Sequence, residues 1–162
     1  MSRRSVPITC TLALMLASKA PFNMADQAVL LPAVTVISVF FWSLFRPSSM
    51  PAAAVFLIGI LLDLLGWMPL GEGTVVLLVV HALCLRWRRL LAKQGFAVIW
   101  LVFLGFAAGA AASMWALTAL LAFRWLPVTP ALFQAVLTAA LYPALAIAFA
   151  GANRGVAAPE RA

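Results

Sequence analysis

Six apolar runs, separated by short charged or proline-containing segments, make up most of this 162-residue chain. Apolar residues account for 66% of it and charged residues for only 9%, with a mean hydropathy of +1.11. A soluble domain of this length cannot bury so much apolar surface, so lipid is the expected solvent for most of the chain. The predicted spans are about Val6–Ser18, Ala28–Phe45, Ala52–Gly66, Thr74–Leu85, Phe96–Phe123 and Ala131–Ala150.

The eleven lysine and arginine residues fall unequally into the gaps between these runs. With a cytoplasmic N-terminus, only Lys19 and Arg124 lie on the outer side. Cytoplasmic loops carry the excess of basic residues in membrane proteins, and every loop here is short. We therefore expect an all-α integral membrane protein, a bundle of about six transmembrane helices with both termini in the cytoplasm. The basic residues on the cytoplasmic side are Arg3, Arg4, Arg46, Arg86, Arg88, Arg89, Lys93, Arg154 and Arg161.

The domain organisation that follows is simple. Residues 1–150 form a single transmembrane helical bundle, because six short spans leave almost nothing for a soluble domain. Residues 151–162 are small, polar or basic, and we expect them to form a disordered cytoplasmic tail.

The third and fourth runs are shorter than the roughly 20 residues that usually cross a bilayer. They form either a re-entrant hairpin or two short full spans, and both arrangements leave Arg46 and Arg86 inside. A re-entrant tip would place the Glu72 carboxylate in the membrane interior, which is costly. Two full spans are favoured, and we then expect Glu72 to lie in water, with Trp67 at the interface.

Asp63 interrupts the apolar stretch of the third run, where an ionisable side chain indicates a functional site by default. Gly59 lies four residues earlier on the same helix face, so a neighbouring helix could approach that face closely. His81 lies on the next, antiparallel helix at a depth that differs by about one helical turn, within reach of a side chain. Three interpretations of Asp63 stay open: a structural hydrogen bond within the bundle, a polar spot that binds a partner, and a proton or substrate site.

No catalytic set accompanies Asp63. The other acidic residues lie at predicted membrane edges or in the tail, and the chain has a single histidine. Neither Cys10 nor Cys84 has a second cysteine at metal-ligand spacing. We therefore expect a protein that is not an enzyme and that uses neither a metal nor a cofactor.

Gly105, Gly109 and Ser113 recur every four residues in the fifth run, so they line one face of the predicted helix. Small residues at this spacing allow a second helix backbone to approach closely. That second helix is either another helix of the same bundle or the single transmembrane helix of a partner, and the sequence leaves both open.

The sixth run contains Tyr142 and Pro143, which predict a kink. The backbone groups that a proline frees inside a membrane helix need protein partners, because lipid offers none.

The net charge of +7 does not indicate nucleic-acid binding, because the basic residues lie at the ends of lipid-length runs rather than on one solvated face. The densest patch is the segment Arg86–Lys93. An anionic inner leaflet attracts such a patch by roughly 1 kcal/mol per charge, so membrane lipids are its expected partners. Docking of an acidic cytoplasmic protein is the alternative.

Residues 41–71 resemble the signature region of the family of the rod shape-determining protein MreD. An aromatic–tryptophan pair and a proline precede a glycine–aspartate helix, which ends in a Pro-Leu-Gly turn. The rest of the chain is similar in size and hydropathy profile only. The residues that carry the resemblance are Phe41, Trp42, Arg46, Pro47, Gly59, Asp63, Gly66, Pro69, Leu70 and Gly71.

The resemblance implies a multi-pass protein of the bacterial inner (plasma) membrane. Such a protein is a membrane scaffold of the cell-elongation machinery, or elongasome, and supports lateral peptidoglycan synthesis and rod cell shape. Its implied partner is MreC, a bitopic protein with a periplasmic domain. The implied complex also contains the actin-like MreB, RodA and the elongation-specific penicillin-binding protein.

The family is also similar to the six-helix substrate-binding subunits of vitamin transporters, so a small substrate-binding membrane subunit is the alternative function. A binder of a polar vitamin needs several convergent polar groups in its outward loops, and this chain offers few. The candidate partner-binding or structural residues are Gly59, Asp63, Gly66, Pro69, Gly71, His81, Gly105, Gly109 and Ser113.

Overall fold

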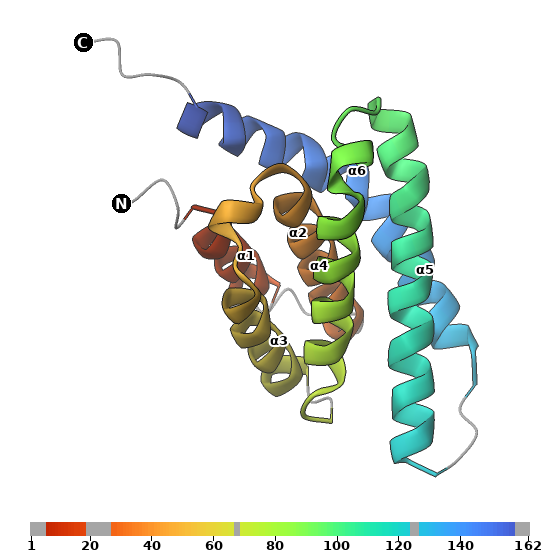
Figure 1. Ribbon diagram of the computed structural model, residues 1–162. Coiled ribbons are helices and arrows are strands. Elements are labelled where there is room, and N and C mark those ends of the chain that lie inside the picture. Colours follow the sequence, from red (N-terminus) through yellow and green to blue (C-terminus); the bar gives the residue numbers. More distant parts are fainter. Residues whose placement is uncertain (1–5, 19–26, 67–68, 124–126, 158–162) are drawn as a thin grey trace.

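The computed structural model describes residues 6–18, 27–66, 69–123 and 127–157, with only the backbone described for 27–29 and 152–157. This part of the chain is all-helical and contains no strand (Figure 1). Arg3, Arg4, Lys19, Trp67, Arg124 and Arg161 lie outside the described residues. The elements are α1 (Val6–Ala17), α2 (Gln27–Phe45), the short 3-10 helix η1 (Pro47–Ser49), α3 (Ala52–Gly66), α4 (Glu72–Leu91), α5 (Phe96–Leu121) and α6 (Thr129–Ala157).

The α-helices fall on the six predicted apolar runs, which confirms the all-helical fold class. Two helices run further than expected. α4 continues past Leu85 to Leu91, because the arginines that end the apolar run are good helix formers. α6 continues to Ala157, seven residues past the boundary at residue 150 that was predicted between the bundle and its tail.

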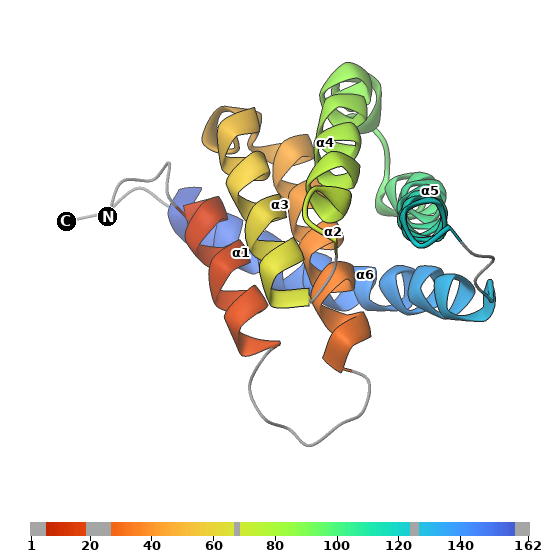
Figure 2. The ribbon, with the colours of Figure 1, turned by 90° about the horizontal axis from the view of Figure 1, so that it is seen from below.

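α2 is the central helix of the bundle. Every side chain from Leu31 to Leu44 is buried, because α1, α3, α4 and α6 all pack against it. Figure 2 shows α6 passing behind α2 and continuing toward α5. Phe40 of α2 meets Phe103 of α5 edge to face at 5.0 Å, and Phe103 stacks on Tyr142 of α6 at 4.2 Å. This aromatic cluster ties the central helix to the last two.

The surface of the bundle is apolar. α5 and α6 are long and apolar enough to cross a membrane, over Phe96–Leu121 and Thr129–Gly151. The remaining apolar helices are shorter. Exposed apolar side chains on this scale are unfavourable in water and typical of a surface that faces lipid. Each α-helix exposes at least one of them, such as Leu16, Phe45, Leu57, Leu90, Leu101 and Val136.

Pro143 lies inside α6, where it lacks the N–H that would bond to the carbonyl of Ala139. The indole N–H of Trp100 on α5 donates to that carbonyl at 3.1 Å instead. The Ala139 carbonyl therefore has the protein partner that a freed backbone group needs in lipid. The same bond fixes α5 against α6 at this level.

Candidate functional site

Asp63 lies on α3, and its carboxylate caps the first turn of α4. Its oxygens accept hydrogen bonds from the backbone N–H groups of Gly71 at 2.8 Å, Gly73 at 2.7 Å and Thr74 at 3.3 Å. The Thr74 hydroxyl donates a fourth at 2.9 Å. The first N–H groups of a helix lack intrahelical partners and carry partial positive charge, so a buried carboxylate is stabilised there. These are the intrabundle bonds that the structural interpretation of Asp63 predicts.

The turn between α3 and α4 delivers these N–H groups to Asp63. Gly66 is the last residue of α3, and the carbonyl of Pro69 accepts a hydrogen bond from the Glu72 N–H at 3.2 Å. Gly71 precedes α4 with φ of 99°, in the left-handed region that residues with a Cβ rarely adopt. Glycine at this position lets the chain reverse within a few residues.

The backbones of α3 and α4 touch along a glycine face. A Cβ at Gly59 would lie 2.5 Å from the Thr74 Cα, and a Cβ at Gly73 would lie 2.5 Å from Oδ1 of Asp63. The Thr74 backbone leaves no room for a Cβ at Gly59, and a Cβ at Gly73 would displace the Asp63 carboxylate. The close approach predicted at Gly59 is confirmed, and it brings Asp63 within hydrogen-bond reach of α4.

His81 does not take part in this cluster. Its Nδ1 lies 2.7 Å from Oγ of Ser43 on α2, and both side chains are buried. The Asp63 bonds all end by Thr74, which lies about 10 Å before His81 along α4. The suggested contact between Asp63 and His81 is therefore wrong, because the carboxylate binds the free N–H groups at the start of α4 instead. His81 instead joins α2 to α4.

Glu72 is buried rather than in water, contrary to the expectation. It is 5% exposed, and its Oε1 accepts a hydrogen bond from the Thr118 hydroxyl of α5 at 2.6 Å. α5 covers it because that helix continues alongside the first turn of α4. Glu72 lies before the apolar stretch that begins at Thr74. Burial raises the pKa of the Glu72 carboxyl. The Thr118 bond opposes this shift in pKa, and the charge of Asp63 adds to it.

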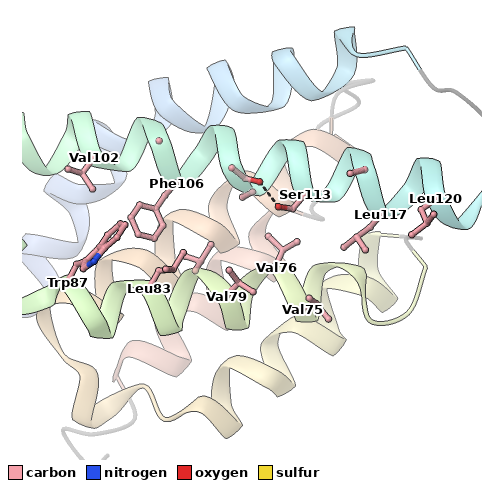
Figure 3. Close-up of a pocket in the computed structure, with 15 residues that line it drawn as sticks. Val75, Val76, Val79, Leu83, Trp87, Val102, Phe106, Ser113, Leu117 and Leu120 are labelled. Carbon is pink, nitrogen blue, oxygen red and sulfur yellow. Dashed lines mark hydrogen bonds between the residues drawn. The ribbon is translucent and has the colours of Figure 1, made fainter.

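An apolar groove of about 730 Å³ runs between α4 and α5 (Figure 3). It extends along α5 from Val102 to Leu120, and Ser113 is the one hydroxyl among its lining side chains. That hydroxyl donates to the Gly109 carbonyl of its own helix at 2.7 Å. The α4 wall consists of Val75, Val76, Val79, Val80, Leu83 and Trp87.

The glycine face of α5 opens into this groove. Gly105 and Gly109 are exposed, and a Cβ at either would meet no described atom within 4 Å. Among the described residues, no helix therefore packs closely against these two glycines. Helices α4 and α5 meet instead near the groove ends, through Trp87 and Phe106 at 6.2 Å and through the bond to Thr118.

Comparison of the chain with protein-family models, with curated proteins and with solved structures gives no match in any of the three.

Sequence reasoning missed the residues that act as partners of the predicted ones. Ser43, Thr74 and Thr118 each bind a buried ionisable group on a different helix. The available signal was polarity, because a hydroxyl inside an apolar run is unusual. Most such hydroxyls in the described helices bond to their own helix, as Thr35 and Ser38 do, so polarity alone does not select the interhelical ones.

Proposed function

We propose that this protein is an inner-membrane scaffold of the bacterial cell-elongation machinery and binds the single transmembrane helix of an MreC-like bitopic protein. In this proposal all six helices cross the membrane and both termini are cytoplasmic. The partner helix lies in the groove between α4 and α5. MreB, RodA and the elongation-specific penicillin-binding protein join the complex, which supports rod shape.

The open groove carries the proposal. Lipid provides no hydrophobic drive for helices to associate, so close packing must supply the affinity. Gly105 and Gly109 leave the α5 backbone bare at two points one turn apart, and nothing in the described bundle covers them. A partner helix placed there would contact backbone on one side and the valines of α4 on the other.

The length of the groove fits a transmembrane helix. Its α5 wall extends from Val102 to Leu120, which corresponds to about 27 Å of helix. The hydrocarbon core of a bilayer is about 30 Å thick. An occupant that uses the whole groove therefore crosses the membrane, as the helix of a bitopic protein does.

The residues that resemble the MreD family build the support of this groove. Asp63, Gly59 and Gly71 fix the start of α4 against α3. α4 forms one wall of the groove, so its position depends on that hairpin. The resemblance thus supports the same site from a different part of the sequence.

The transporter alternative receives no comparable support. A pocket for a polar vitamin needs convergent hydrogen-bonding groups. The one hydroxyl of this groove, on Ser113, already donates to its own helix. The lining therefore suits an apolar helix face.

The test is copurification of the tagged bitopic partner from mild detergent. Gly109→Leu places a large side chain in open space, so the protein should fold and insert normally. In the complex the same side chain collides with the partner, at a cost of about 1–3 kcal/mol. This corresponds to a roughly 5- to 150-fold higher Kd. Cells that carry this variant should be rounded at normal protein levels.

Ala108→Leu is the matched control, because Ala108 is exposed on the same helix but does not line the groove. It should recover as much partner as the wild type. Undiminished recovery by Gly109→Leu would place the interface elsewhere.

A further inference from the structure

Four exposed cationic residues lie at one end of the groove. Arg86, Arg88 and Arg89 belong to the last turns of α4, and Lys93 follows in the turn to α5. No carboxylate in the described segments neutralises them. The acidic residues of these segments are Asp63 and Glu72, and Glu72 is the first residue of α4. It lies about 21 Å from Arg86 along the helix axis.

The cationic end adjoins apolar surface that belongs to the groove. Trp87 lines the groove and packs edge to face on Phe106 of α5. Arg86 follows Leu83 by three residues, so it lies one turn further along the groove-facing side of α4. Leu90, one turn after Trp87, is 70% exposed. Cationic side chains thus stand directly beyond an apolar channel, with a tryptophan at the boundary.

We propose that, in the protein without its partner, an anionic phospholipid of the inner leaflet occupies this end of the groove. Its phosphate binds the guanidinium group of Arg86, since the planar donors of arginine match phosphate oxygens, and Arg88, Arg89 and Lys93 add positive charge within two turns. One acyl chain lies along Leu83, Trp87 and Phe106. The charge pattern selects this occupant, because a zwitterionic lipid brings no net negative charge to balance the cations.

The inference rests on the proposed function in one respect: the lipid holds the place that the partner helix takes over. Lipid composition would then regulate partner binding. The test below uses the protein alone in vesicles, so it succeeds or fails whether or not the partner binds.

The experiment reconstitutes the protein with phospholipids that carry a photoreactive group on one acyl chain. One set has phosphatidylglycerol headgroups and the other phosphatidylcholine headgroups, and mass spectrometry locates the cross-links. We expect cross-links at Leu83, Val102 and Phe106 to be at least tenfold stronger with phosphatidylglycerol, and this preference to fall at high salt. Equal cross-linking by the two lipids would overturn the proposal.

A charge variant tests the role of the arginines. Arg86→Gln, Arg88→Gln and Arg89→Gln together should abolish the preference for the anionic lipid. The control replaces Arg3, Arg4 and Arg154 by glutamine, which removes the same charge from the same expected side and should leave the preference intact. An unchanged preference in the first variant would contradict the proposal. Should that variant fail to fold, the salt dependence of the wild type decides the question alone.

Discussion

Replacing Asp63 by leucine removes the acceptor of four hydrogen bonds at the start of α4. Two of the donors are backbone N–H groups of buried residues, Gly73 and Thr74, and a third belongs to the half-buried Gly71. An unsatisfied buried donor costs about 1–3 kcal/mol, so stranding the two buried N–H groups lowers the free energy of unfolding by about 2–6 kcal/mol. This is a large part of the stability of a small bundle.

Two milder variants grade the effect. Asp63→Asn keeps one accepting oxygen and should cost about half as much, about 1–3 kcal/mol. Thr74→Val removes the hydroxyl donor and leaves the backbone bonds in place, so it should cost about 1 kcal/mol or less. The capping role therefore predicts the order Asp63→Leu, Asp63→Asn, Thr74→Val, from the largest loss to the smallest.

Thermal unfolding of the purified protein in mild detergent, together with the folded yield from membranes, measures this order. Wild-type stability of Asp63→Leu would refute the capping role. Loss of function in Asp63→Asn at wild-type stability would indicate a proton site instead.

Three other outcomes follow from the same geometry. Gly59→Ala should lower the unfolding temperature, because the added Cβ forces α3 away from α4. Gly105→Ala should not lower it, because its Cβ meets open space. Equal effects would contradict the close approach of α3 and α4. Trp100→Phe should lower the free energy of unfolding by about 1–3 kcal/mol, because the Ala139 carbonyl loses its hydrogen-bond donor. The loss should be smaller in a Pro143→Ala background, where a backbone N–H replaces the indole. Additive losses in the double variant would contradict this coupling. Leu70→Cys, in a cysteine-free background, should react with impermeant maleimide from outside the cell, because Leu70 is 72% exposed at the α3–α4 turn. Labelling only after membrane disruption would contradict the proposed topology, in which this turn faces outward.

Helix positions were predictable because apolar runs in lipid leave the backbone little choice but helix. The bounds of α3 agree with its run, Ala52–Gly66, where Pro51 precedes the first turn and Gly66 ends the last. Gly59 was predictable too, since a glycine four residues from a buried aspartate marks a close helix contact. Such signals are local in the sequence.

Contacts between distant segments were not predictable in the same way. The burial of Glu72 depends on α5 reaching the first turn of α4, and the pairing of His81 with Ser43 depends on the rotation of two helices. The direction in which Gly105 and Gly109 face was equally open, because spacing identifies a face without saying what lies opposite it. The packing of the whole bundle decides each of these.

Photocross-linking from two positions in living cells tests the proposed helix site most directly. A photoreactive amino acid at Val79 lies in the groove, and one at Leu101 is exposed on α5 outside it. The account predicts that Val79 cross-links to the transmembrane helix of the MreC-like partner and that Leu101 does not. Cross-links to this partner from Leu101 with none from Val79 would contradict it.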